Sequence, residues 1–300
     1  MKNKPLVSVI MNCYNGEKYL KDSLISVIKQ NYKNWELIFW DNKSNDRSAE
    51  ILKGFKDKRI RYYYAKKKTE LYEARNLAIK KTKGKFISFL DVDDIWFPEK
   101  LQLQVRKFKN KDVGLVYGKY YKINNNNIIK KKQLITKKNL PTGNITSLLL
   151  KDYSVGLLTI VIRKSFLKKN VFRVKYNYLG DLDFVLKFSL KYKFEAIQKP
   201  IAMYRQHENQ MQRKYYKMKS IQFEKWCKEI TKLKTFGAKQ NLKLFQEWNR
   251  FHKTITLIKS KNYYKAIFAL VRYPLNFNKV KLLIIFCLPN FISKNIINET

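Results

Sequence analysis

The chain has 300 residues, of which 45% are hydrophobic, so it can bury a sizeable core and is not a disordered protein. Its 64 Lys and Arg residues against 23 Asp and Glu residues leave a net charge of +41, which predicts an anionic partner such as nucleic acid, a membrane surface or a phosphorylated substrate. A coding bias toward Lys and Asn would explain the same excess, so charge alone does not choose among these partners.

Short apolar strands alternate with helical patterns over the first 90 residues. The order predicts an α/β fold, a Rossmann-like, mostly parallel sheet flanked by helices. We expect Ser44 or Asn45 to cap the second helix and Gly84 to end the third. The predicted strands cover residues 6–11, 35–40, 59–64 and 85–90, and the predicted helices cover residues 17–30, 46–55 and 70–83.

The later elements are more mixed. We predict strands over residues 113–123 and 158–162, a hairpin turn in the Asn-rich stretch 124–127, and a helix over residues 179–192. Beyond residue 211 only helical patterns follow. The sequence therefore predicts an α/β domain over residues 1–211 and a basic, aromatic-rich helical extension over residues 212–300.

Acidic residues follow the strand at 85–90, where ligands of parallel sheets bind. Asp91, Asp93 and Asp94 place like charges in one crevice, which is unfavourable unless a cation lies between them. Hard divalent ions such as Mg²⁺ or Mn²⁺ favour carboxylate oxygens and keep substrate phosphates among their ligands. The alternative is that Asp93 or Asp94 caps a helix opened by Pro98.

Further candidates follow other elements. Asp41 ends the second strand, where a carboxylate can accept a hydrogen bond from a base or ribose; the alternative is an Asx-turn. Arg75 can reach a diphosphate or can lie on a solvated helix face. Asp181 and Asp183 open a predicted helix, where either can act as a general base or simply favour the helix dipole.

Several segments together resemble family 2 glycosyltransferases of the GT-A fold. The resemblance covers about residues 5–210, and the motifs occur in the family's order. They are the opening strand and turn at residues 6–16, Asp41-Asn42-x-Ser44-x-Asp46, Ala74-Arg75-Asn76, Leu90-Asp91-Val92-Asp93-Asp94, Gly180-Asp181 and Tyr204-Arg205-x-His207.

This resemblance implies a hexosyltransferase-type enzyme. It would move a sugar, with inversion, from a nucleoside-diphosphate donor, most simply a UDP-sugar, to a hydroxyl of a glycan or lipid-linked acceptor in surface polysaccharide synthesis. It assigns nucleoside contacts to Tyr14, Glu17 and Asp41, a donor contact to Arg75, a ribose or sugar contact to Asp91, a Mn²⁺ or Mg²⁺ contact to Asp93, a further metal or diphosphate contact to His207, and the general base to Asp181.

Two departures from the family pattern affect which of the family's residue roles can be assigned to this sequence. Asn12 stands where the family usually has Pro, and residues 67–71 replace the Gly-containing turn that often precedes Ala-Arg-Asn. Phosphate contacts in that turn are therefore not carried over. Asp183 competes for the role of base, and we prefer Asp181 because it directly follows Gly180, as in the motif.

The helical extension interleaves basic and aromatic residues, as helices on anionic membrane surfaces do. Its apolar faces could instead pack on the first domain or on a partner subunit. Three cysteines without metal-ligand spacing, and an N-terminus without a signal-peptide pattern, predict a cytoplasmic protein, with the extension at the inner face of the cytoplasmic membrane.

Two other functions are weaker alternatives. A nucleic-acid-binding protein would fit the charge, but no nucleic-acid motif is present, so we expect no nucleic-acid partner. A nucleotidyltransferase on a similar fold would need a Gly-rich phosphate loop, which the sequence lacks.

Overall fold

The computed structural model describes residues 4–124, 132–136, 138–168, 171–207, 216–232, 239–259, 262–275 and 277–287. The chain divides into two compact units, Met1–Lys214 and Tyr215–Thr300, which we describe separately.

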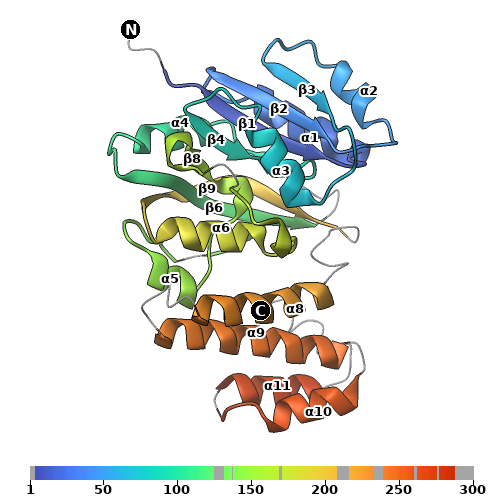
Figure 1. The fold of residues 1–300 in the computed structure, drawn as a ribbon, viewed down its shortest axis with the longest axis vertical. Coiled ribbons are helices and arrows are strands. Elements are labelled where there is room, and N and C mark those ends of the chain that lie inside the picture. The colour runs from blue at the N-terminus through green and yellow to red at the C-terminus, as the bar shows by residue number, and fades with distance from the viewer. Residues whose placement is uncertain are drawn as a thin grey trace. The chain divides into compact units, whose positions relative to one another are not determined.

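The first unit alternates strands and helices along its first 110 residues and then becomes mixed (Figure 1). Its elements are β1 (Val7–Cys13), α1 (Glu17–Ile28), β2 (Trp35–Asp41), α2 (Ser48–Lys53), β3 (Ile60–Tyr64), α3 (Leu71–Ile79), β4 (Phe86–Phe89), β5 (Ile95–Trp96), α4 (Lys100–Lys107), β6 (Val113–Asn124), β7 (Gln133–Leu134), α5 (Thr146–Lys151), β8 (Val161–Arg163), α6 (Gly180–Ser189) and β9 (Lys193–Gln206).

One sheet runs through this unit in the order β3-β2-β1-β4-β8-β6-β9-β5, with β7 paired to β6. Strands β3, β2, β1 and β4 are mutually parallel, and β6 is parallel to β9. Strand β8 joins the two parts by antiparallel pairing with β4 and β6. The predicted α/β fold, with a parallel sheet flanked by helices, is confirmed.

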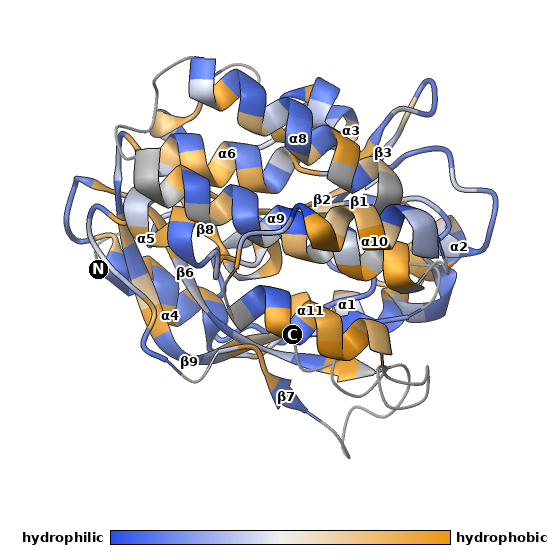
Figure 2. Ribbon diagram, turned by 90° about the horizontal axis from the view of Figure 1, so that it is seen from below, coloured by the Kyte–Doolittle hydropathy of each residue, from blue (hydrophilic) through white to orange (hydrophobic). Residues whose placement is uncertain are grey.

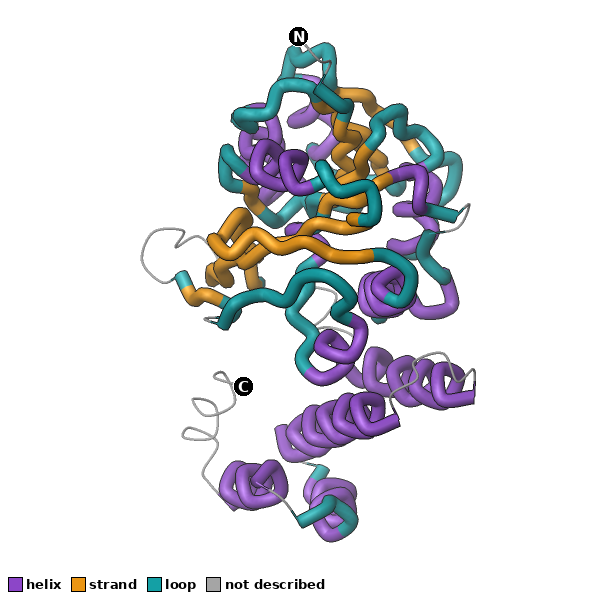
Figure 3. The backbone as a smooth tube through the Cα atoms, turned by 90° about the vertical axis from the view of Figure 1, so that its left-hand side faces the viewer, coloured by secondary structure: helices purple, strands orange, loops and turns teal. Residues whose placement is uncertain are grey.

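Strand β1 is buried on both faces, which explains its nearly unbroken apolar run. Val9 and Met11 share a core with Leu20 and Leu24 of α1. Helices cover both faces of the sheet (Figure 3), so alternate residues of the strand meet different helices.

Some predicted boundaries are wrong because side chains make contacts with distant residues. Ser44 does not cap α2; its hydroxyl accepts a hydrogen bond from the Asn15 backbone N–H (3.1 Å). Gly84 does not end α3, which stops at Ile79; a Cβ at Gly84 would lie 2.7 Å from the Ser8 backbone nitrogen, so glycine permits a close approach to β1.

Two later segments also differ from the prediction. Residues 157–159 form a 3₁₀ turn before the short strand β8, and the long strand β9 was not predicted. The hairpin is confirmed by antiparallel pairing of Tyr121 with Leu134, although the turn beyond Asn124 lies outside the described residues.

The second unit, where it is described, consists of helices, as predicted. They are α8 (Tyr216–Lys232), α9 (Lys239–Lys259), α10 (Tyr263–Val271) and α11 (Phe277–Cys287). Phe251 and Ile255 of α9 pack with Leu270, Leu282 and Ile285 in one apolar cluster. In the part of the chain that the structure describes, no helix combines the length and the hydropathy needed to cross a bilayer.

Candidate functional site

The carboxyl ends of β1, β2 and β4 lie at one edge of the sheet because these strands are parallel neighbours. The register pairs Cys13 with Asp41, and Ile10 with Phe89. Asp41 ends β2, Tyr14 directly follows β1, and Asp91 comes two residues after the end of β4, so all three emerge at the same edge. This is where ligands of such sheets bind.

The loops after β1 and β2 are locked together by side chain to backbone hydrogen bonds. The backbone N–H of Gly16 donates to Ser48 Oγ (2.9 Å), and that of Glu17 donates to Asp46 Oδ2 (2.9 Å). In return, the Arg47 backbone N–H donates to Glu17 Oε2 (3.0 Å). The predicted nucleoside contact Glu17 therefore helps to hold the frame of the site.

The other two predicted nucleoside contacts differ in accessibility. Asp41 is fully buried; its Oδ1 accepts from the Ser44 backbone N–H (2.7 Å) and its Oδ2 from the Tyr62 hydroxyl (3.0 Å). Burial, followed by the hydrogen bond to Asp41, raises the pKa of Tyr62, so this hydroxyl stays a donor. Tyr14 is 46% exposed, with Lys68 Nζ 3.6 Å from its ring centroid.

Arg75 is buried beneath Asp91. Its Nη2 donates to both Asp91 oxygens, at 2.6 and 2.9 Å, while its side chain is 3% exposed and that of Asp91 is 42% exposed. Burial opposes the guanidinium charge, but the charge of Asp91 more than offsets it and raises the pKa of Arg75. The alternative that Arg75 lies on a solvated helix face is therefore wrong. Its buried guanidinium holds Asp91 at the surface.

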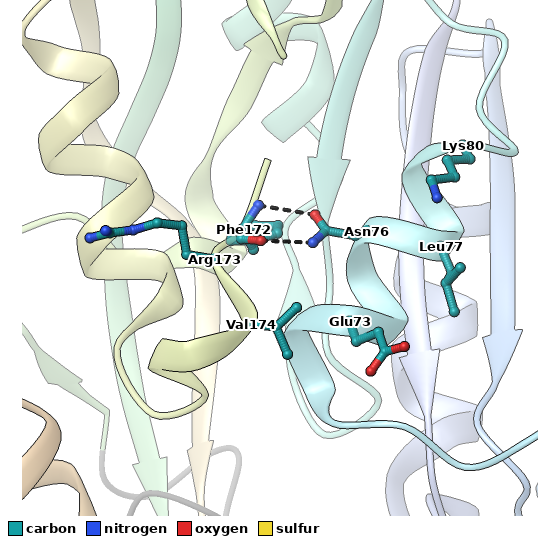
Figure 4. Close-up of a pocket in the computed structure, with 7 residues that line it drawn as sticks. All are labelled: Glu73, Asn76, Leu77, Lys80, Phe172, Arg173 and Val174. Carbon is teal, nitrogen blue, oxygen red and sulfur yellow. Dashed lines mark hydrogen bonds between the residues drawn. The ribbon is translucent and has the colours of Figure 1, made fainter. Parts of the chain in front are cut away.

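Asn76, the next residue of α3, anchors a distant segment. Its amide donates to the Phe172 carbonyl (2.7 Å) and accepts from the Phe172 backbone N–H (2.9 Å). Figure 4 shows this pair beside a pocket that contains none of the predicted site residues. The pocket is lined by Glu73, Asn76, Leu77, Lys80, Phe172, Arg173 and Val174.

Asp93 and His207 come together from positions 114 residues apart. Asp93 Oδ2 lies 2.9 Å from His207 Nε2, and both side chains are partly exposed. His207 directly follows β9, and its ring packs against Tyr19 of α1 (centroids 5.1 Å apart). The sequence predicted both residues as metal contacts, and the fold places them side by side.

Arg205 ties β9 to the acidic loop, a contact that the sequence analysis missed. It is 1% exposed; its Nε donates to the Asp93 carbonyl (2.9 Å) and its backbone N–H to Asp94 Oδ1 (3.0 Å). The available signal was strand alternation, which places Arg205 on the same face as His207. The helix-cap alternative is wrong for Asp94, because β5 lies between Asp94 and α4.

Asp94 is the most buried acid of this loop. Burial, together with the charges of Asp93 and Asp91, raises its pKa well above the usual range for an aspartate. Its contact with the Arg205 backbone partly opposes this shift. Asp91 and Asp93 are thus the accessible carboxylates of the loop, and Asp94 belongs to its support.

Asp181 and Asp183 have different environments at the start of α6. Asp181 is partly exposed, and its Oδ1 accepts from the Tyr72 hydroxyl (3.0 Å) and the Leu182 backbone N–H (2.8 Å). Asp183 is 2% exposed; it accepts from Arg173 Nε (2.7 Å) and lies 3.3 Å from Lys187 Nζ. Asp183 is therefore committed to buried ion pairs.

Taken together, Asp91, Asp93 and Asp181 present accessible carboxylates, and His207 adds an imidazole. Within the described ranges, no three His, Cys, Asp or Glu side chains are grouped to hold one metal ion. The Asp93–His207 pair could hold an ion only if the ligand supplied the remaining oxygens, as phosphates do for Mg²⁺.

The chain is similar to proteins of one family. Residues 8–169 match the family model described as Glycosyl transferase family 2. UDP-Glc:alpha-D-GlcNAc-diphosphoundecaprenol beta-1,3-glucosyltransferase WfgD of Escherichia coli is 38% identical over 165 residues, which cover 54% of this chain and 62% of WfgD. The match therefore spans less than two thirds of that relative's length.

Solved structures share the fold. S. aureus TarS 1–349 in complex with UDP-GlcNAc matches with a TM-score of 0.66 and 20% identity, over 88% of this chain and 79% of that one. The mannosyltransferase PcManGT from Pyrobaculum calidifontis, in complex with GDP-Man and Mn²⁺, matches with a TM-score of 0.58 and 15% identity, over 94% and 79% of the two chains.

The environment of Asp183 predicts a role in stability. Replacing Asp183 by Asn removes the negative charge between Arg173 and Lys187, and we expect the free energy of unfolding to fall by about 1–3 kcal/mol. Asp181→Asn is the matched control, because its carboxylate is partly exposed and forms no ion pair with any of the described residues. Urea unfolding of both variants measures the difference, and equal stabilities would contradict the assignment of Asp183.

Proposed function

The chain belongs to glycosyltransferase family 2, and we propose that it transfers a sugar, with inversion, from a nucleoside-diphosphate sugar to a hydroxyl of a glycan or lipid-linked acceptor. The observation that carries this proposal is the joint support of two accessible carboxylates by α3: Asp91 through Arg75, and Asp181 through Tyr72. One then faces the donor and the other the acceptor. WfgD, whose name specifies a diphosphoundecaprenol acceptor, favours the lipid-linked class and a place in surface polysaccharide synthesis.

On the donor side, we assign the nucleoside to the edge formed by the loops after β1 and β2. The exposed ring of Tyr14 can contact the base, and Lys68 beside it adds positive charge for a phosphate. Asp41 and Glu17 would act mainly by shaping this edge, because both already accept hydrogen bonds within the protein. A UDP-sugar is the simplest donor, since WfgD uses UDP-Glc by name and TarS was solved with UDP-GlcNAc.

The residues present fit a divalent metal. Neighbouring ligands of an octahedral ion at about 2.1 Å lie about 3 Å apart, and Asp93 Oδ2 and His207 Nε2 are separated by 2.9 Å. Asp93 and His207 would hold Mn²⁺ or Mg²⁺ together with donor phosphate oxygens. When bound, the ion would neutralise charge on the leaving diphosphate.

On the acceptor side, Asp181 is the proposed base. Its partly exposed carboxylate can accept the proton of the acceptor hydroxyl as that oxygen attacks the anomeric carbon. Asp183 is unsuited to this role because Arg173 and Lys187 enclose it. The buried Arg75 keeps Asp91 in place on the donor side, where Asp91 can accept from a ribose or sugar hydroxyl.

The base assignment predicts a specific defect. Asp181→Asn should retain binding of UDP and lower the transfer rate by about 10²–10⁴-fold, because the amide cannot take a proton. Asp183→Asn is the control. Its transfer rate should fall only in proportion to the fraction of the protein that is no longer folded. Radiolabelled sugar transfer and calorimetric titration with UDP measure the two properties. The opposite pattern would move the base to Asp183.

The metal site gives a second prediction. Asp93→Ala and His207→Ala should each abolish the Mn²⁺-dependent rise in melting temperature that UDP produces, since each removes one proposed ligand. Asp22→Ala is a nearby control, because Asp22 contacts Arg205 but not His207. Thermal unfolding with UDP and Mn²⁺, separately and together, tests this, and an unchanged combined shift in both variants would refute the metal assignment.

We further propose that the second unit lies on an anionic membrane surface. Tyr264, Val271 and Leu275 are 83%, 71% and 93% exposed, and Figure 2 shows α10 and α11 as mostly hydrophobic. Residues 248–298 contain nine Lys or Arg residues and no Asp or Glu. Exposed apolar side chains in a segment whose charged residues are all basic are typical of helices that bind the surface of anionic membranes. Such binding would bring the enzyme to a lipid-linked acceptor.

This proposal predicts vesicle binding. The full chain should sediment with phosphatidylglycerol vesicles, and the double variant Val271→Glu/Leu275→Glu should bind about 10- to 100-fold more weakly, because it places charge in the apolar face. Met218→Glu/Ile221→Glu on α8 is the matched control. Salt should weaken binding only in part. If the unmodified chain does not sediment with these vesicles, the face serves packing instead.

A further inference from the structure

One turn of α3 contacts both proposed catalytic carboxylates. Tyr72 donates its hydroxyl proton to Asp181 Oδ1 (3.0 Å), and Arg75, three residues later, donates to both oxygens of Asp91 (2.6 and 2.9 Å). The Arg75 guanidinium also lies 5.1 Å from the Tyr72 ring centroid. Residues at i and i+3 share one helix face, so their relative positions are fixed by the helix itself.

Tyr72 is held tightly in this position. It is 4% exposed and its ring packs against that of Phe172, with centroids 5.1 Å apart. A Cβ at Gly180 would lie 2.6 Å from the ring, so only glycine lets the start of α6 approach so closely. The aromatic ring and the glycine together set how far Asp181 stands from α3.

The Tyr72 hydroxyl is a permanent donor. Burial, followed by the charge of Asp181, raises the pKa of Tyr72 well above its usual value. The hydroxyl thus remains protonated, and Asp181 Oδ1 is its acceptor. After burial, the charge of Asp181 also contributes to the raised pKa values of Tyr120 on β6 and of Tyr153.

The two oxygens of Asp181 are therefore not equivalent. Both hydrogen bonds to this carboxylate, from the Tyr72 hydroxyl and the Leu182 backbone N–H, end on Oδ1. None of the described residues donates a hydrogen bond to Oδ2. A carboxylate anchored through one oxygen keeps the other free, in a fixed direction, for a ligand.

We propose that Tyr72 is a positioning residue that anchors Asp181 through Oδ1, so that Oδ2 receives the proton of the acceptor hydroxyl. In this step the acceptor oxygen forms a bond to the anomeric carbon, the bond from that carbon to the diphosphate oxygen breaks, and the diphosphate leaves with the electron pair. The proton passes to Oδ2. This inference rests on the proposed role of Asp181 as base.

In the sequence, Tyr72 lies outside the motif residues of α3. Tyr72 lies just after residues 67–71, the stretch that departs from the family pattern before Ala74-Arg75-Asn76. Its ring lies against Gly180, the residue before Asp181. The contact thus joins Tyr72, a residue outside the motifs, to the motif residues Gly180 and Asp181 at the start of α6.

Tyr72→Phe tests the proposal, because it keeps the ring against Gly180 and removes only the hydroxyl. With UDP-glucose as donor and a synthetic lipid-diphosphate-linked N-acetylglucosamine as acceptor, we expect kcat to fall about 10- to 100-fold, as for loss of a hydrogen bond to a charged group. The KM for the donor should change less than about twofold, since Tyr72 would not touch it. A lowered donor affinity with unchanged kcat would overturn the proposal.

Two controls separate positioning from general damage. Tyr117→Phe removes another buried phenol, whose hydroxyl donates to the Pro141 carbonyl (2.8 Å), and should leave kcat unchanged. In the Asp181→Asn background, Tyr72→Phe should cause no further loss, because it acts through the carboxylate. An equal loss in both backgrounds would show that Tyr72 acts independently of Asp181.

A measurement without substrate completes the test. Crystal structures of the unmodified chain and of Tyr72→Phe should show the Asp181 carboxylate rotated or in several rotamers in the variant only. An unmoved carboxylate would overturn the positioning role even if both proteins are active. If instead Asp181→Asn transfers sugar at the normal rate, the proposed base itself fails, which is a distinct result.

Discussion

The buried parallel pairing of β1 with β2 and β4 is the constraint on which the rest of the structure depends. Because successive side chains of β1 point to opposite faces, sliding it by one residue would exchange Val7, Val9 and Met11 with the set that contains Ser8 and Asn12, although both faces are buried. Polar contacts oppose the same slip: Ser8 Oγ donates to Glu36 Oε1 (2.6 Å) and accepts from the Gly84 backbone N–H (2.8 Å). With this register held, Tyr14, Asp41 and Asp91 can emerge only at one edge.

Around this edge, many motif residues support the site and do not face it. Asn42 holds the turn before α3 through Thr69, Asn76 holds the segment at Phe172, and Arg205 holds the acidic loop to β9. Each is buried and uses several hydrogen bonds, as polar side chains in a core must. The predicted site residues with accessible side chains are Tyr14, Glu17, Asp91, Asp93, Asp181 and His207.

The first half of the fold could be predicted because its signals are local. The strands 6–11, 35–40 and 85–90 are apolar runs, and acids directly follow two of them. Strand β9 was missed because its burial alternates irregularly, it contains Pro200, and its register with β6 shifts near Gly118. No local pattern showed that its last residues would lie beside Asp93.

In the candidate site, too, local motifs could be predicted and contacts between distant residues could not. The motifs predicted which residues would gather at the edge, including the Asp93–His207 pair. They did not show that Glu17 and Asp41 would accept hydrogen bonds from Arg47 and Tyr62, since these partners come from the turn before α2 and from strand β3. The different environments of Asp181 and Asp183 could not be predicted from the sequence either, because they depend on a contact in the folded chain: Arg173 donates a hydrogen bond to Asp183 and not to Asp181.

The distribution of thiols provides a built-in probe of the helical unit. Burial raises the pKa of Cys13 and raises that of Cys227 to about 12, so both thiols resist alkylation, whereas Cys287 on α11 is exposed. A maleimide fluorophore should therefore attach selectively at this one position in the native chain. Its emission colour would report whether α11 meets water, lipid or protein, with no engineered cysteine required.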